Sequence, residues 1–77
     1  MTPVVLKTKN LKIKIYPKDH RPPHVHILGP GVSAKIEIES LECIANYGFT
    51  LAEIRRIQNF LSLWQVFLLE SWNDYQE

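Results

Sequence analysis

The chain has 77 residues, 45% of them hydrophobic and 22% charged, with a net charge of +1, as is ordinary for a small globular domain. Its longest apolar runs are three to four residues, whereas a membrane-spanning helix needs about 20, and its single cysteine excludes an internal disulfide. We therefore expect one domain over residues 1–77, with no membrane segment and, because no secretory signal is recognisable at the N-terminus, a cytoplasmic location.

The start of the chain has the alternation of a half-buried strand. Residues 11–16 alternate strictly between apolar and polar side chains, so the apolar ones share one face. A short β-prone run at residues 4–6 precedes them, with turn-forming residues in between. The two segments form either a hairpin or one bulged strand.

A proline-rich loop over residues 17–23 interrupts this pattern, because proline cannot donate to a sheet ladder. Further strands are expected over residues 24–28, 32–39 and 42–45, with a Gly-Pro-Gly turn between the first two. If the strand at 11–16 lies beside the strand at 32–39, the lysines of the first pair with the glutamates of the second across the outer face.

The last third of the chain predicts one long helix over residues 51–75. Thr50 and Glu53 have the spacing of a capping box, so the helix begins at Leu51. Apolar residues recur at spacings of three and four, without proline or glycine after residue 48. A second apolar flank widens this stripe, and either the sheet curls round the helix or a second subunit covers it. A homodimer through the C-terminal helix is therefore one expectation.

Together these elements predict an α+β fold. We expect a small, mostly antiparallel sheet of three to five strands, with one long C-terminal helix packed on one face. The strands and the histidine- and proline-rich loop occupy residues 4–45, and the helix occupies residues 51–75.

All three histidines lie within the seven residues from His20 to His26, directly after Asp19. On a strand, His24 and His26 point to the same side, because side-chain direction repeats every two residues. Paired imidazoles with a carboxylate suit zinc, nickel or iron. One interpretation is therefore a divalent transition-metal site formed by His24 and His26 with His20 or Asp19.

Two other interpretations of this segment stay open. In one, the catalytic residues are His20, His24 and His26, acting as general base and acid in RNA cleavage, since imidazole titrates near neutral pH. Arg21 and Lys18 would then stabilise phosphate charge. In the other, the segment binds a partner or holds the loop together. The candidate binding residues are Lys18, Arg21, Pro22 and Pro23.

The run from His20 to His26 has the pattern H-x-P-P-H-x-H and is followed by a turn, an alternating strand and a tryptophan-bearing helix. Over roughly residues 9–75 the chain resembles the bacterial domain-of-unknown-function 4160 family. The resemblance implies a small cytoplasmic bacterial protein, often encoded beside another small domain in a toxin–antitoxin-like arrangement. It therefore implies a partner protein and brings no established reaction.

Charge is distributed unevenly along the chain. Residues 1–40 carry seven basic and three acidic side chains, whereas residues 41–77 carry two basic and five acidic ones. This asymmetry suits either an RNA-binding face or a solvated, lysine-rich sheet face. We expect a component of a toxin–antitoxin-like pair that acts through protein binding at the histidine-rich loop. The alternative is a histidine- or metal-dependent ribonuclease, so the sequence leaves open whether the protein is an enzyme.

Overall fold

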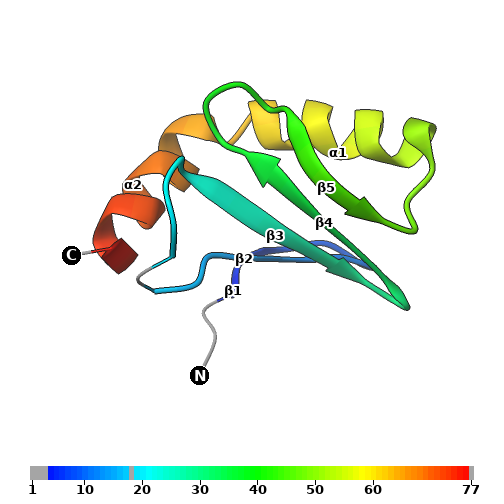
Figure 1. Cartoon of the computed structure of the whole chain (residues 1–77), viewed down its shortest axis with the longest axis horizontal. Coiled ribbons are helices and arrows are strands. Elements are labelled where there is room, and N and C mark those ends of the chain that lie inside the picture. The colour runs from blue at the N-terminus through cyan, green and yellow to red at the C-terminus, as the bar shows by residue number, and fades with distance from the viewer. Residues whose placement is uncertain (1–3, 18, 77) are drawn as a thin grey trace.

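The computed structural model describes residues 4–17 and 19–76 and shows an α+β fold with a five-stranded antiparallel sheet and two helices (Figure 1). The elements in chain order are β1 (Val4–Lys7), β2 (Lys12–Lys14), β3 (His24–Gly29), β4 (Val32–Glu37), β5 (Cys43–Tyr47), α1 (Leu51–Ser62) and α2 (Gln65–Gln76). Neither helix in these two ranges is long and apolar enough to cross a bilayer.

The sheet is a meander, with its strands in the order β1-β2-β3-β4-β5. The first two strands form a hairpin rather than one continuous strand, and their register shifts between Val4 and Leu6. A second register shift lies between Lys35 and Ile36, where β4 pairs with β5. The expected turn after β3 is present, and Gly31 there has a φ angle of +71°, which favours glycine.

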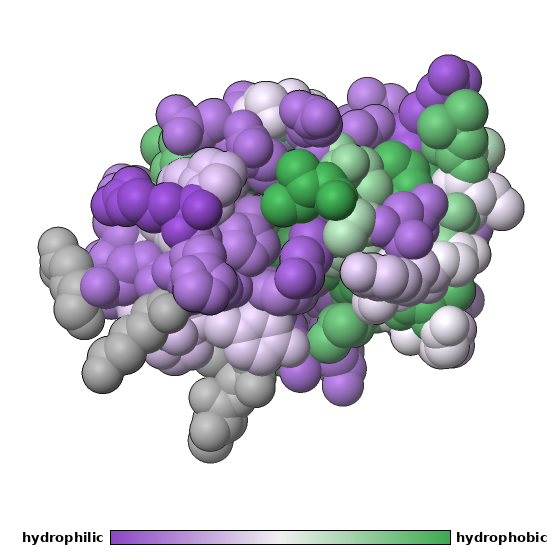
Figure 2. All heavy atoms as spheres, in the orientation of Figure 1, coloured by the Kyte–Doolittle hydropathy of each residue, from purple (hydrophilic) through white to green (hydrophobic). Residues whose placement is uncertain are grey.

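The core lies between one face of the sheet and the helices. Ile13, Ile27 and Ala34 are opposite one another on three neighbouring strands and are buried. The buried side chains of α1 are Ile54, Ile57 and Leu61, spaced as one helical stripe. The sheet's other face carries Lys12 and Lys14 of β2 and Lys35 of β4. In the space-filling view, hydrophilic side chains cover most of the left half, and hydrophobic ones appear near the centre and in the right half (Figure 2).

The expected pairing of lysines with glutamates across the outer face was wrong. It needed β2 beside β4, but β3 lies between them. His26 therefore stands opposite both Lys14 and Lys35. The structure places a histidine where the sequence suggested a carboxylate.

The expectation of one long helix was also wrong, because the chain bends at Leu63 and Trp64. The amide of Leu63 donates to Phe60 O and that of Trp64 donates to Leu61 O, so the last turn of α1 is tightened to three-residue spacing. A straight helix over residues 51–75 would be about 38 Å long, longer than the molecule's longest extent of 34 Å. The bend lets both halves stay on a small core, so Leu68 and Trp72 of α2 are also buried.

The second helix lies beside the start of β3 and the loop that precedes it (Figure 1). Side-chain amides fix it there. Gln76 donates to the carbonyl of Tyr16 at 3.0 Å, and Gln65 donates to the carbonyl of Ile38 at 2.9 Å. The loop itself is tied to the sheet, because the amide of Ile38 donates to Pro23 O. The segment before β3 is thus held from both sides.

Candidate metal centre

The histidine pair stands at the start of β3, the central strand of the sheet. Because His24 and His26 are two residues apart on a strand, both point to the outer face. Val25 between them points into the core, where it is opposite Ile36. The burial of Val25 therefore fixes the direction of both imidazoles.

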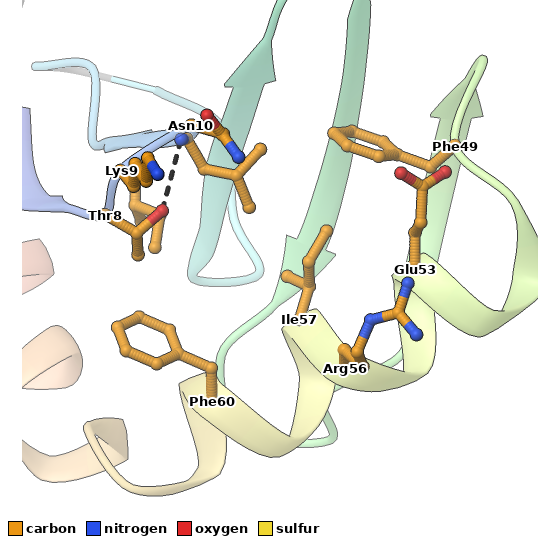
Figure 3. A pocket seen from close by; sticks show the side chains of 10 residues that line it. Thr8, Lys9, Asn10, Phe49, Glu53, Arg56, Ile57 and Phe60 are labelled. Carbon is orange, nitrogen blue, oxygen red and sulfur yellow. Dashed lines mark hydrogen bonds between the residues drawn. The ribbon is translucent and has the colours of Figure 1, made fainter.

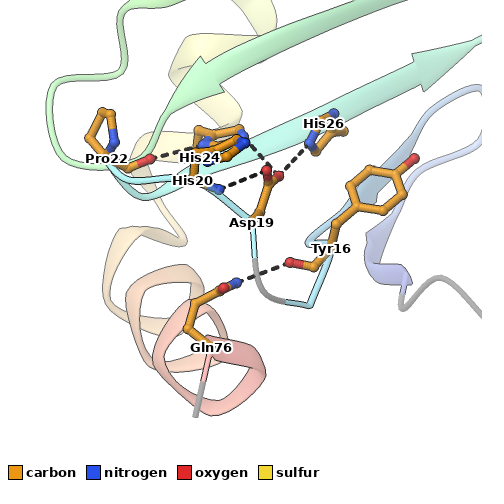
Figure 4. Close-up of polar contacts among 7 residues, drawn as sticks. All are labelled: Tyr16, Asp19, His20, Pro22, His24, His26 and Gln76. Carbon is orange, nitrogen blue, oxygen red and sulfur yellow. Dashed lines mark hydrogen bonds and ion pairs between the residues drawn. The ribbon is translucent and has the colours of Figure 1, made fainter.

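Asp19 reaches from the preceding loop to both imidazoles (Figure 4). Its Oδ2 lies 3.0 Å from His24 Nε2 and 3.0 Å from His26 Nε2. Its other oxygen, Oδ1, accepts a hydrogen bond of 2.8 Å from the backbone amide of His20. A single carboxylate oxygen is thus shared by two ring nitrogens.

The hydrogen bond on the far side of His24 fixes the tautomer of that ring. Nδ1 of His24 lies 2.9 Å from the carbonyl oxygen of Pro22. A carbonyl only accepts, so Nδ1 carries a proton, and in the neutral ring Nε2 then has a free lone pair. That lone pair faces the Asp19 carboxylate at 3.0 Å. Two acceptors this close need a cation between them, which is either a proton that they share or a metal ion.

The pKa values of Asp19 and His26 are both lowered. Burial lowers the pKa of His26, and this outweighs the hydrogen bond to Asp19, which raises it. Burial raises the pKa of Asp19, but the hydrogen bonds from His26 and from the His20 amide, with the charges of the two histidines, bring the net pKa below its ordinary value. Near neutral pH these shifts favour a carboxylate beside a neutral imidazole, the forms that bind a metal.

Aromatic side chains wall this cluster on two sides. The Tyr16 ring meets the His26 ring edge-on, with centroids 4.3 Å apart. The Trp72 ring of α2 lies 5.3 Å from the His24 ring. His24 is buried, whereas the side chains of His26 and Asp19 are 17% and 19% exposed. The cluster is therefore closed on the Trp72 side and reached by solvent only in part, at His26 and Asp19.

The donor atoms of Asp19, His24 and His26 all lie within 4.8 Å of one another. Ligands bound tetrahedrally at 2.0–2.1 Å stand about 3.3 Å apart. The two distances of 3.0 Å from Asp19 therefore need only a small expansion to admit a zinc-sized ion. The Nδ1–H bond from His24 to a backbone carbonyl is the outer contact that metal-bound histidines usually make.

The structure separates the residues that the sequence grouped together. His20 contributes only its backbone amide, and its exposed imidazole is not part of the cluster. Arg21 is exposed, Pro22 offers its carbonyl to His24, and Pro23 is buried and accepts from Ile38. Lys18, the remaining candidate binding residue, lies outside the described residues.

Sequence reasoning missed the neighbours of the cluster. Tyr16 reads as the outer end of an alternating strand, and Trp72 reads as one member of a helical stripe. The register that puts Lys14 and Lys35 on either side of His26 depends on strand order. The signal that could have found Lys14 and Tyr16 was the alternation of residues 11–16, because it places these two side chains on the same face of the strand.

A separate cavity of about 410 Å³ lies between the β1–β2 turn and α1. Ile57 and Phe60 of α1 face that turn across it, and Lys9 and Arg56 also line it (Figure 3). No histidine lines this cavity. Its acidic lining residue is Glu53, whose carboxylate already accepts a hydrogen bond from the amide of Thr50.

One protein family, described as domain of unknown function (DUF4160), matches residues 10–73 of the chain. No curated protein and no solved structure matches the chain. The matched range includes the whole cluster of Asp19, His24 and His26, together with Trp72.

Proposed function

The chain belongs to the DUF4160 family, and from this premise and the geometry above we propose that it acts at a divalent transition-metal centre formed by Asp19, His24 and His26. The observation that carries the proposal is the single Asp19 oxygen held 3.0 Å from the Nε2 atoms of His24 and His26. In His24 the other ring nitrogen, Nδ1, carries a proton that it donates to the Pro22 carbonyl. Zinc fits this donor set of two imidazoles and one carboxylate.

A hydrolytic role fits this centre better than a purely structural one. Structural zinc sites use four protein ligands, whereas catalytic sites use three and leave one position for water or substrate. The described residues offer three donors, and two of them, His26 and Asp19, are partly exposed to solvent. When bound, the ion would lower the pKa of a water molecule at that position and polarise a substrate oxygen. The chain's own groups orient the ligands: the Pro22 carbonyl orients the His24 ring, and the His20 amide orients the Asp19 carboxylate.

Isothermal titration of the metal-free protein with Zn²⁺, and absorption spectroscopy with Co²⁺ as a probe, test this centre. We expect saturable binding of one ion per chain and Co²⁺ bands of a four-coordinate site. Asp19→Asn and His26→Gln should each weaken binding by at least tenfold, because each removes one of only three ligands.

His20→Ala is the matched control, since it removes a histidine of the same segment that lies outside the cluster. It should bind Zn²⁺ as the unmodified protein does, with circular dichroism confirming that all variants are folded. Equal losses in His20→Ala and His26→Gln, or no saturable binding by the unmodified protein, would contradict the metal centre. In that case a shared proton would explain the contact between His24 and Asp19.

A second candidate function is the binding of a partner protein, favoured by exposed apolar residues where α1 meets α2. Leu63 is 81% exposed and Val66 is 73% exposed. Beside them Trp64 and Phe67 are in edge-on contact and are also exposed. Hydrophobic side chains grouped in this way mark interaction surfaces. This helix elbow, rather than the histidine loop, is where we place partner binding.

The toxin–antitoxin-like arrangement that the sequence resemblance implies is compatible with both surfaces. The metal centre would carry the harmful activity, and a partner on the helix elbow would restrain it. Sedimentation equilibrium of the chain alone distinguishes a second copy of this chain from a different protein as the partner. A dimer that Phe67→Lys dissociates supports the homodimer through α2. A monomer would mean that the exposed apolar residues at the helix elbow bind a different protein.

A further inference from the structure

We propose that the outer face of the sheet binds the phosphodiester backbone of a single-stranded nucleic acid and presents it to the metal centre. This inference rests on the proposed function, because it names the substrate class of that same site. It is carried by the strand register, which arranges cations, an exposed tyrosine and His26 in two neighbouring rows across one face.

The first row runs through the metal centre. Lys14, His26 and Lys35 are directly opposite one another on β2, β3 and β4. Partners on neighbouring strands lie about 5 Å apart and on the same side of the sheet. A cation therefore stands on each side of the histidine ligand. An anionic group that spans the two lysines would lie over His26.

The second row lies two residues along the strands. Lys7 is opposite Lys12, and the row continues through Leu28 and Ser33 to Tyr47. Tyr47 is 65% exposed, although tyrosine usually buries much of its ring. Proteins that bind single strands combine a cationic surface with aromatic rings on which bases stack. Tyr47 supplies such a ring at the far edge of this face.

None of these lysines forms a salt bridge in the described part of the chain, although Glu37, two residues from Lys35 and opposite His24, lies on the same face. Within residues 4–17 and 19–76, the recorded ion pairs join only Asp19 to the two histidines. Like charges directly opposite on a sheet are destabilising, so the pair of Lys7 and Lys12 weakens the fold unless an anion lies nearby. A polyanion would remove that cost. The face therefore has both the charge and the unpaired cations that a phosphodiester chain requires.

The reaction is hydrolysis of one phosphodiester linkage. The oxygen of a water molecule forms a bond to phosphorus, and the bond from phosphorus to one ester oxygen breaks. The leaving oxygen keeps the bonding electron pair and receives a proton from the water, which gives a phosphomonoester and an alcohol. Lys14 and Lys35 hold the non-bridging oxygens, and His26 with Asp19 and His24 defines where the water stands.

Fluorescence anisotropy with labelled 12-nucleotide RNA, DNA of the same sequence and the corresponding duplex tests the surface. Binding is measured in EDTA, so that it is independent of the metal centre. We expect both single strands to bind, the duplex to bind more weakly, and affinity to fall steeply as salt rises. Lys14→Gln with Lys35→Gln should weaken binding at least tenfold, and Tyr47→Ala about tenfold, with Tyr47→Phe unchanged.

Arg55→Gln with Arg56→Gln is the matched control, because it removes two exposed cations from α1, on the opposite side of the sheet. It should change affinity less than twofold. Equal losses in the two double variants, or no binding of either single strand at low salt, would overturn the proposed surface even if Zn²⁺ binds.

Cleavage of the same oligonucleotides with added Zn²⁺, Co²⁺ or Mn²⁺ then tests the link between the surface and the centre. We expect RNA or DNA to be cut by the unmodified protein and not by Asp19→Asn. Lys14→Gln with Lys35→Gln should chiefly raise KM. Tight binding in EDTA without cleavage under any of these metals would mean that the bound strand is not the substrate of the centre.

Discussion

Gly48 lies between β5 and α1 with a φ angle of +109°, a backbone conformation that residues with a side chain rarely adopt. A Cβ atom built there would lie 2.7 Å from Cγ1 of Val32. The turn is also closed by Asn46, whose side chain donates to the carbonyl of Phe49 and accepts from its amide. At the residue scale, the approach of α1 to the sheet thus depends on the absence of one side chain.

Gly48→Ala should therefore lower the free energy of unfolding by about 2 kcal/mol or more, because backbone strain and overlap with Val32 add together. Gly31→Ala is a control with the same sign of φ but open space around the new methyl group. It should cost only about 1 kcal/mol. Urea unfolding of both variants measures the difference, and equal stabilities would show that Val32 moves aside without cost.

The two helices differ in how their ends are fixed. Thr50 accepts from the amide of Glu53, and Glu53 accepts from the amide of Thr50, so α1 begins with a complete capping box. The start of α2 instead follows directly from the bend, where the amide of Leu68 donates to Trp64 O. At the element scale, α1 has its own start signal, whereas α2 is placed by packing and by the amides of Gln65 and Gln76.

Thr50→Ala should lower the free energy of unfolding by about 1 kcal/mol, because it leaves an amide of the first turn without its acceptor. Chemical unfolding at neutral pH measures this loss. Thr50→Ser keeps the hydroxyl and should be close to the unmodified protein. A similar loss in both variants would assign the effect to the threonine methyl group instead.

The capping box should also depend on pH. Hydrogen bonds from the amide and hydroxyl of Thr50 lower the pKa of Glu53. A lowered pKa in the folded state gives stability that is complete above the ordinary glutamate pKa and is lost as the pH falls through the lowered value. Glu53→Gln keeps a neutral acceptor at all pH values. The stability difference between the two proteins should therefore shrink or reverse on going from pH 7 to pH 3, and a constant difference would contradict this role for the Glu53 charge.

At the scale of the whole molecule, the candidate metal centre joins segments that are far apart in the sequence. Asp19 comes from a loop, the histidines come from the central strand, and Trp72 comes from the last helix. Gln76 binds the same loop at Tyr16. An ion held by Asp19, His24 and His26 would therefore stabilise the contacts among the loop, the central strand and α2.

Zn²⁺ should consequently raise the thermal stability of the chain. An ion at 100 times its Kd that binds only the folded state adds about 2.7 kcal/mol, which corresponds to a rise in Tm of about 10–20 °C for a chain of this size. Differential scanning calorimetry with Zn²⁺ and then EDTA measures the effect. Asp19→Asn should show little rise, and the same rise in this variant would place the bound ion elsewhere.

Much of the sheet was predictable from the sequence, because strand direction follows from alternation and turns follow from Gly31 and its neighbours. The start of α1 was predictable for a similar local reason, the spacing of Thr50 and Glu53. The bend was not, because residues 51–75 keep an unbroken apolar stripe and only the size of the core limits the helix. The sharing of one Asp19 oxygen was equally hidden, since it depends on how a proline-rich loop returns over β3.

The register shifts in the first and last strand pairs have a consequence for how copies of this chain meet. Among the described residues the sheet is open, so β1 and β5 each have one edge that pairs with no other strand and to which a further strand could be added. An extra residue bends and twists a strand locally, and each edge strand pairs irregularly with its neighbour. Both edges are therefore poor templates for strand addition, and we expect the protein to resist fibril formation and to associate, when it does, through its helices.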